Sequence, residues 1–269
     1  MDIATGTVRT EGADIVYDHQ GSGPLLLLIP GGGGDAARYH RLMNVLADRY
    51  TVVTYDRRGN SRSVVDTEAD LDMAQQARDA VAVIRAMGHD KAFVFGNSGG
   101  ANIALELAAG HPETIAALVV HEGPTLLILP DADTCLAWAD RVHKTYLADG
   151  AMAAMDVFNE CLVGFDPLPP TSAVPNADFF MAREYLQIST YRPDFDAIRR
   201  NRIPVAAAAG RDSGDAYYAR TARLHADHLG CEYAEFPGNH LAFIFDPPAF
   251  ATALTHVLDQ LVDGGRPGQ

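Results

Sequence analysis

The stretch GNSGG, residues 96–100, places one hydroxyl group among small residues and is the strongest chemical signal in the chain. It follows the apolar run KAFVFG, which predicts a buried strand, and it begins a stretch with helical spacing. A strand that turns at once into a helix presents Ser98 above a sheet, and so tight a turn needs small residues such as Gly96 and Gly100. The helix also aims its first N–H groups at negative charge near the hydroxyl. The pattern predicts a nucleophile for acyl transfer, with a plain glycine-rich bend as the alternative.

A seryl hydroxyl needs a general base, and the chain has ten histidines. His240 lies in FPGNHLAF, between the last predicted strand and the last predicted helix, where a loop can return a side chain over the strand ends. His40, His143 and His225 are instead predicted to be solvated. We therefore expect His240 to take the proton from Ser98, with a surface loop histidine as the alternative.

Strands and helices alternate on both sides of these residues. Apolar runs predict strands at residues 5–10, 14–19, 24–30, 50–56, 91–96, 115–123, 203–210 and 231–238. Helical spacing predicts helices at residues 36–48, 71–87, 98–109, 217–229 and 248–262. Repeated strand–helix units favour an α/β fold with a mostly parallel central sheet that is covered by helices on both faces. Sheets of this kind bind ligands at the carboxyl ends of their strands.

The middle of the chain has a different character, because helical patterns dominate residues 124–202 and no strand is predicted there. We expect a core domain of residues 1–123 and 203–269, and a helical cap domain of residues 124–202 above the strand ends. Trp138 is predicted to contact substrate from the cap, with burial against a neighbouring helix as the alternative. Further aromatic residues in the cap suit an apolar substrate chamber or the interior of the cap itself, namely Phe158, Phe179, Phe180, Tyr185 and Tyr191.

Composition limits the partners of the protein. The formal net charge of −14 predicts repulsion of nucleic acid and of anionic lipid, so we expect a small-molecule substrate. Three cysteines without a CxxC pattern favour neither a disulfide framework nor a zinc site, and no metal or other cofactor is expected. The first residues do not resemble a secretory signal, and the longest apolar runs are far shorter than a membrane span. We expect a cytoplasmic protein, and a homodimer remains open.

Taken together, the motifs resemble the α/β-hydrolase superfamily over nearly the whole chain. The stretches that carry the resemblance are IPGGGG, YDRRGNSRS, GNSGG and FPGNHLAF. The resemblance implies the α/β-hydrolase fold with a helical cap. Because the glycine run stands where the family usually has His-Gly, it also implies an oxyanion hole built from the backbone N–H groups of Gly32 and Gly99. The DRRG stretch, residues 56–59, is interpreted as a structural ion-pair and turn element.

The triad acid has two candidate positions within this family. One follows the strand VAAAAG, where the usual position is Ser213 and Asp212 is its neighbour. The other is the end of the preceding strand, where Glu122 follows an apolar run. A carboxylate at a buried strand end is costly unless it is paired, and an imidazolium partner relieves that cost. We therefore prefer Glu122 and keep Asp212 in reserve.

These residues predict a serine hydrolase that cleaves a carboxylic ester or lactone of a small, mainly apolar molecule through an acyl-enzyme intermediate. The order serine, glutamate, histidine also looks like that of fungal and bacterial hydrolases of zearalenone-type macrolactones, although Gly123 stands where many similar sequences have proline. Two alternatives remain open. One is a cofactor-independent lyase or C–C bond hydrolase on the same fold, and the other is a non-catalytic ligand receptor.

Overall fold

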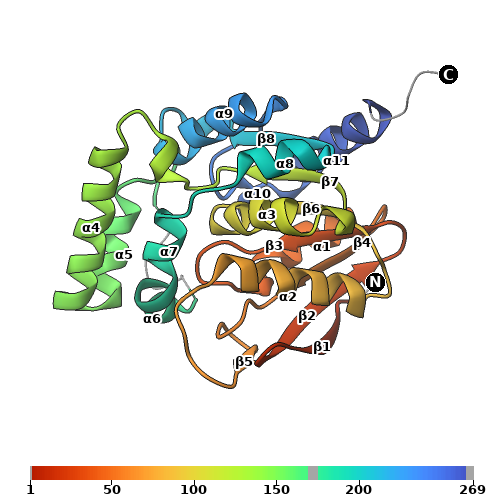
Figure 1. Cartoon of the computed structure of the whole chain (residues 1–269), viewed down its shortest axis with the longest axis horizontal. Helices are drawn as coiled ribbons and strands as arrows, with labels where there is room; N and C mark the ends of the chain where they lie inside the picture. Colours follow the sequence, from red (N-terminus) through yellow and green to blue (C-terminus); the bar gives the residue numbers. More distant parts are fainter. Residues whose placement is uncertain (1, 169–174, 265–269) are drawn as a thin grey trace.

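One sheet runs through the part of the chain that the computed structural model describes, residues 2–168 and 175–264 (Figure 1). Its strands are β1 (Ala4–Thr10), β2 (Ala13–Gly21), β3 (Leu25–Ile29), β4 (Thr51–Tyr55), β5 (Val64–Val65), β6 (Ala92–Asn97), β7 (Ile115–His121), β8 (Val205–Gly210) and β9 (Glu232–Phe236). Their order is β1-β2-β4-β3-β6-β7-β8-β9, with β5 beside β2. Pairing is parallel from β4 to β9 and antiparallel at β1 and β2. The predicted, mostly parallel sheet is confirmed.

Helices cover both faces of the sheet. One face carries α2 (Met73–Ala86), α3 (Gly99–Gly110) and α9 (Tyr217–Leu229), and the other carries α1 (His40–Leu46) and α11 (Pro247–Gly264). The first predicted helix begins as a 3-10 turn, η1 (Ala36–Tyr39), which the Asp35 side chain caps. Short elements such as β5 and α10 (Ala242–Phe245) were not predicted from the sequence.

Strand β3 explains why the sheet needs helices on both sides. Its side chains alternate between two hydrophobic clusters, as the pleat of a strand requires. Leu25, Leu27 and Ile29 belong to the cluster under α2 and α3, whereas Leu26 and Leu28 belong to the cluster under α1 and α11. All five side chains are buried. A run of consecutive leucines therefore marks a strand that is buried on both faces.

The segment between β7 and β8 is helical, and no strand lies in its described part. Its described elements are the 3-10 turn η3 (Leu126–Ile128), α4 (Ala132–Asp149), α5 (Ala151–Asn159), α6 (Ala177–Phe179), the π-helical turn η5 (Phe180–Glu184), α7 (Tyr185–Ser189) and α8 (Phe195–Asn201). We call residues 124–202 the insertion. Helices α4 and α5 pack together at the left end of the molecule in Figure 1, opposite the two termini.

The last helix of the insertion lies against the core. Helix α8 packs on α3 and α9, and the Asn201 side-chain amide donates to the carbonyl oxygens of Ala108 and Ala109 near the end of α3, at 2.8 and 3.0 Å. The predicted boundary at residue 202 thus follows a helix that packs with the core. The division into two domains remains a prediction.

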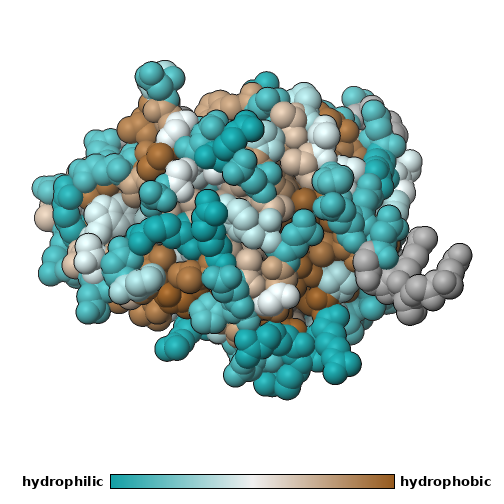
Figure 2. Space-filling model, turned by 90° about the horizontal axis from the view of Figure 1, so that it is seen from above, coloured by the Kyte–Doolittle hydropathy of each residue, from teal (hydrophilic) through white to brown (hydrophobic). Residues whose placement is uncertain are grey.

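Hydrophilic side chains cover most of the face seen in Figure 2, and apolar side chains form scattered patches between them. This distribution agrees with the large negative charge of the chain. Within the described ranges, no helix has the length and apolar character needed to span a bilayer.

Candidate active site

The turn between β6 and α3 holds Ser98 in an unusual backbone conformation, with φ 56° and ψ −130°. Residues other than glycine rarely adopt positive φ, and such strain is concentrated at functional sites. A Cβ at Gly96 would lie 2.3 Å from the carbonyl oxygen of Gly100, and one at Gly100 would lie 2.1 Å from that of Ile29. The predicted need for small residues on both sides of Ser98 is therefore confirmed.

Glu122 and His240, which are far apart in the sequence, are joined by a hydrogen bond. The Glu122 side chain is fully buried beyond the end of β7, and its Oε2 accepts from Nδ1 of His240 at 2.6 Å. Its other oxygen, Oε1, accepts from the backbone N–H of Gly210 at 2.9 Å. Because Nδ1 carries the donated proton, Nε2 of the ring remains able to accept one. This is the arrangement that a general base requires.

The surroundings of Glu122 keep it ionised. Burial alone raises the pKa of its carboxyl group, but the neighbouring His121 and the hydrogen bond from His240 outweigh that effect and hold the pKa below its usual range. Burial lowers the pKa of His121 to about 4, so this ring is neutral at pH 7. At neutral pH the hydrogen bonds from His240 and Gly210 therefore carry the stabilisation of the carboxylate.

The structure does not bring Asp212 to the histidine. This residue lies on the 3-10 turn η6 (Arg211–Ser213), where its side chain is 55% exposed and lies 3.8 Å from Arg211. Its backbone N–H donates to the carbonyl oxygen of Gly238. Of the two candidate acids, only Glu122 contacts His240 among the described residues.

Asn97, the residue before the serine, ties the site together, and sequence reasoning missed it. Its side-chain amide donates to Nδ1 of His121 at 2.9 Å and to the backbone carbonyl of His240 at 3.2 Å. The ring of Tyr218 packs on the imidazole of His240, with 4.4 Å between the ring centres. Asn97 therefore joins the ends of β6 and β7 to the histidine loop. The only signal for it was its place inside the serine motif.

Ser98 and His240 line the same cavity, which has a volume of about 1100 Å³. Among the described residues the Ser98 hydroxyl is not hydrogen-bonded to the imidazole, and such contacts often tighten only when substrate binds. The lining of this cavity is mainly apolar. Its members from the insertion and from α10 include Met155, Phe158, Leu162, Phe180, Phe243 and Ile244.

The glycine loop lies against the serine turn. A Cβ at Gly31 would lie 2.9 Å from the Cβ of Ser98, and one at Gly99 would lie 3.5 Å from the backbone nitrogen of Gly32. Gly32 also lines the cavity. Gly99 begins α3, where a helix leaves its first N–H groups without partners in the helix. The two N–H groups that the family resemblance implicates thus lie close together beside the nucleophile.

Trp138 lies behind the cavity wall and is not part of its lining. Its ring packs on Phe158 and Tyr217, with ring centres 6.1 and 5.6 Å away. Helix α5 supplies Phe158 to the wall and separates the cavity from Trp138 on α4. Of the aromatic residues considered for the chamber, Phe158 and Phe180 line it, and three do not: Phe179, Tyr185 and Tyr191.

The prediction that His225 is solvated was wrong. Its side chain is fully buried because its position on α9 faces the core, and Nε2 lies 2.7 Å from the Thr125 hydroxyl. Burial lowers its pKa to about 3. The ring also lies beside Gly123, where a Cβ would come within 3.2 Å of it. His40 is partly exposed and lies 2.8 Å from the Asp18 carboxylate.

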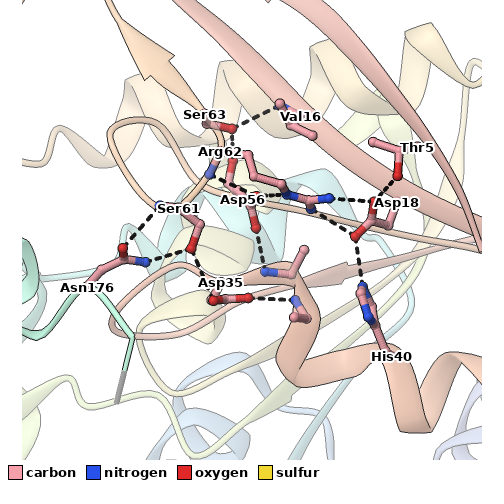
Figure 3. Close-up of polar contacts among 12 residues, drawn as sticks. Thr5, Val16, Asp18, Asp35, His40, Asp56, Ser61, Arg62, Ser63 and Asn176 are labelled. Atoms are coloured by element: carbon pink, nitrogen blue, oxygen red, sulfur yellow. Dashed lines mark hydrogen bonds and ion pairs between the residues drawn. The ribbon is translucent and has the colours of Figure 1, made fainter. Parts of the chain in front are cut away.

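The DRRG stretch forms ion pairs, as predicted. Arg57 is fully buried and contacts both oxygens of Glu184, at 2.8 and 2.6 Å. Arg58 contacts both oxygens of Asp79, at 2.6 and 2.7 Å. The loop continues into a second polar network, in which Arg62 reaches two further carboxylates (Figure 3).

Metal-binding clusters of three or more His, Cys, Asp or Glu side chains do not occur within residues 2–168 and 175–264. The three cysteines are free thiols.

Comparison with known proteins gives matches over most of the chain. A sequence model of the alpha/beta hydrolase fold matches residues 24–153. The chain is 31% identical over 270 residues to the uncharacterized hydrolase YraK of Bacillus subtilis (strain 168), covering 97% of this chain and 98% of YraK.

Many solved structures share the fold, among them an esterase and a lactonase. A thermophilic esterase from Thermogutta terrifontis superposes with a TM-score of 0.79 at 18% identity, over 96% of this chain and 99% of the esterase. The enol-lactonase from Burkholderia xenovorans LB400 superposes with a TM-score of 0.74 at 16% identity, over 94% of this chain and all of the lactonase chain. At these identities the likeness establishes the fold alone.

Proposed function

The chain belongs to the α/β-hydrolase family, and we propose that it is a serine hydrolase that cleaves a carboxylic ester or lactone of a small, mainly apolar molecule. One observation carries the proposal. His240 is held by a buried hydrogen bond to Glu122, and it lines the same cavity as Ser98. The carboxylate fixes the imidazole with a free Nε2, and the strained turn presents the hydroxyl.

In the first half of the reaction, the Ser98 Oγ attacks the carbonyl carbon of the substrate and its proton passes to Nε2 of His240. The carbonyl oxygen becomes negative and accepts hydrogen bonds from the N–H groups of Gly32 and Gly99. Glu122 stabilises the imidazolium, which then gives its proton to the leaving alkoxide. The C–O bond of the ester breaks, and the acyl group remains on Ser98.

In the second half, His240 takes a proton from water, and the hydroxide attacks the acyl-enzyme. The tetrahedral intermediate collapses, the carboxylic acid is released, and the imidazolium returns its proton to Ser98. With a lactone, the leaving alkoxide stays attached to the acyl chain, so the product is a hydroxy acid. Glu122 stays ionised throughout.

The cavity supports the choice of substrate. Its wall is mainly apolar, and its volume of about 1100 Å³ can contain a small organic ester. An esterase and an enol-lactonase share the fold, so the fold itself is compatible with this class of carbonyl chemistry. The cytoplasmic location and the independence from cofactors expected from the sequence stay predictions.

A fluorophosphonate probe tests the nucleophile. The purified protein is incubated with the probe, digested and mapped by mass spectrometry, with Ser98→Ala as the matched control. We expect one modified peptide that contains Ser98, and no modification in the variant. Labelling of another residue, or no labelling of the wild type, would contradict the proposal.

Isotope labelling separates hydrolysis from a lyase reaction and from ligand binding without turnover. Short p-nitrophenyl esters and macrolactones are incubated with the protein in water enriched in oxygen-18, and the masses of the acid products are measured by mass spectrometry. Hydrolysis places one labelled oxygen in the carboxylate. A lyase would leave the product unlabelled, and a receptor would yield no product.

A further inference from the structure

The peptide group between Gly31 and Gly32 is held at its carbonyl end. A peptide unit is planar and nearly always trans, so its C=O and N–H bonds point in opposite directions. Nη2 of Arg57 donates to the carbonyl oxygen of Gly31 at 2.8 Å. Because the Gly31 oxygen and the Gly32 N–H belong to one rigid plane, fixing the oxygen also fixes the direction of the N–H.

This control matters because the loop contains four consecutive glycines, Gly31 to Gly34. Glycine populates both signs of φ, and Gly33 and Gly34 here have φ of 77° and 50°. A glycine peptide can rotate and turn its carbonyl oxygen, rather than its N–H, toward the nucleophile. An oxyanion would then meet an oxygen instead of a donor.

Arg57 is oriented by a residue of the insertion. Its guanidinium is fully buried, and both of its ion-pair contacts go to Glu184, which is 1% exposed. Asn60 also donates to Glu184 Oε1, at 2.9 Å. A buried charge without its partner is strongly destabilising, so the carboxylate fixes where the guanidinium lies.

The insertion also holds the next two peptides of the loop, Gly32–Gly33 and Gly33–Gly34. Glu184 Oε2 accepts from the N–H of Gly33 at 3.4 Å, and the Asn176 side-chain amide donates to the carbonyl oxygen of Gly33 at 2.6 Å. Figure 3 shows Asn176 donating to the Ser61 hydroxyl, which in turn donates to Asp35, the residue after the glycine run. Glu184 ends the π-helical turn η5, a local geometry that is frequent at functional sites.

We propose that Arg57 and Glu184 are positioning residues that turn the Gly32 N–H toward the oxyanion, so that the insertion takes part in catalysis as well as in substrate selection. The inference rests on the proposed function, because it assigns the Gly32 N–H to the oxyanion hole. In this proposal neither Arg57 nor Glu184 contacts the substrate. Their effect passes through the Gly31–Gly32 peptide.

The test removes both charges together in the Arg57→Met, Glu184→Met double variant, which leaves no unpaired buried ion. With p-nitrophenyl butyrate we expect kcat to fall by about 10²-fold, the lower end of the effect of losing an oxyanion donor. KM should change by less than about threefold, because the substrate wall is intact.

A trifluoromethyl ketone inhibitor provides a readout that loss of stability does not move. Ser98 Oγ adds to its carbonyl carbon, the serine proton goes to His240, and the carbonyl oxygen becomes an anion in the oxyanion hole. The affinity of the double variant for an alkyl trifluoromethyl ketone should fall in parallel with kcat, by about 10²-fold. The affinity for the product butyrate should stay at the wild-type value.

The matched control is the Arg58→Met, Asp79→Leu double variant, which removes the neighbouring ion pair of the same loop. It should keep wild-type kcat and ketone affinity even where its melting temperature falls. Equal losses in the two double variants would overturn the inference, and so would wild-type ketone affinity in Arg57→Met, Glu184→Met.

If the double variant does not fold, Glu184→Gln carries the test. The amide oxygen can still accept from Arg57, while the charge and the second acceptor are lost. We expect kcat and ketone affinity to fall together by about tenfold, about 1.4 kcal/mol of stabilisation; unchanged values would overturn the inference. A wild type that fails to react with fluorophosphonate contradicts the proposed function itself, so the two failures are distinguishable.

Discussion

The two sides of the candidate site are organised differently. On the acid–base side, two charged or polar side chains at the ends of core strands contact each other directly, Glu122 and His240. On the proposed oxyanion side, the groups are the neutral backbone N–H groups of Gly32 and Gly99, and the buried Arg57–Glu184 ion pair contacts the peptide that carries the Gly32 N–H. The two side chains orient each other by their own hydrogen bond, whereas a glycine loop needs contacts from other residues to fix its conformation. The predictions below test that difference.

The largest expected effect breaks the acid–base side. Glu122→Gln keeps the shape of the side chain but presents an amide to His240, which loses the carboxylate that fixes its tautomer. We expect kcat to fall by about 10³- to 10⁴-fold, as for loss of the acid in other triads. Steady-state hydrolysis of p-nitrophenyl butyrate measures the loss.

Asp212→Asn is the matched control, because Asp212 is the acid that the fold leaves exposed on η6. Its kcat should stay within about twofold of the wild type, the ordinary range for a surface substitution. If kcat fell as far in Asp212→Asn as in Glu122→Gln, the assignment of Glu122 as the triad acid would be contradicted.

Acid should lower the stability of the protein, because two buried histidines, His121 beside Glu122 and His225 on α9, are neutral in the folded state. Their folded pKa values, about 4 for His121 and about 3 for His225, lie below the usual 6.5, so between pH 6.5 and 4 the unfolded chain binds protons that the folded chain does not. Stability is therefore full above pH 6.5 and falls as the pH drops, by about 3 kcal/mol per histidine at pH 4. Urea unfolding at pH 7 and pH 4 measures it.

The variant that sharpens this test is His225→Gln, which cannot take up a proton. Its loss of stability between pH 7 and pH 4 should be smaller than that of the wild type by about 3 kcal/mol. His256→Gln, which removes an exposed histidine from α11, should keep the wild-type loss. Equal pH dependence in His225→Gln and the wild type would show that burial of this ring does not govern acid stability.

A smaller effect is expected at Asn97, which ties the acid–base side together. Asn97→Ala removes the donor to His121 and to the His240 carbonyl. We expect kcat to fall by about tenfold, since loss of a buried hydrogen bond is worth about 1 to 3 kcal/mol and only part of it reaches the imidazole. Asn201→Ala loses two comparable bonds far from the site and should keep its kcat.

The smallest effect is expected at Trp138, behind the wall of the cavity. Trp138→Phe keeps an aromatic ring against Phe158, so KM and kcat should each change by less than about threefold. Phe158→Ala, which opens the wall itself, should raise KM more than Trp138→Phe does. The reverse order would place the tryptophan in contact with substrate.

Much of the fold and part of the site could be predicted because their signals are local. Five consecutive residues, GNSGG at 96–100, predict the strand–turn–helix around Ser98. Glu122 and His240 each follow a recognisable strand. The short elements β5 and α10 have no periodic pattern of their own. They form because neighbouring elements position them.

Other features could not be predicted, because their partners are distant. The sequence indicates that Arg57 forms an ion pair, but its acceptor, Glu184, lies 127 residues away in another segment. His225 was misassigned because α9 turns that position inward, which depends on the packing of α9. The same applies to Trp138, since only the placement of α5 determines which aromatic residue reaches the cavity.

The contacts that Glu184 and Asn176 make with Gly33 limit how this scaffold can be re-engineered. Replacing the insertion with that of a homologue would exchange both side chains together with the residues of the insertion that line the cavity. We expect a chimera without Glu184 and Asn176 to have the substrate preference of the homologue, but also a more mobile glycine loop, because the hydrogen bonds to Gly33 would be lost. Chimeras should therefore keep Glu184 and Asn176 and change only the other residues of the insertion.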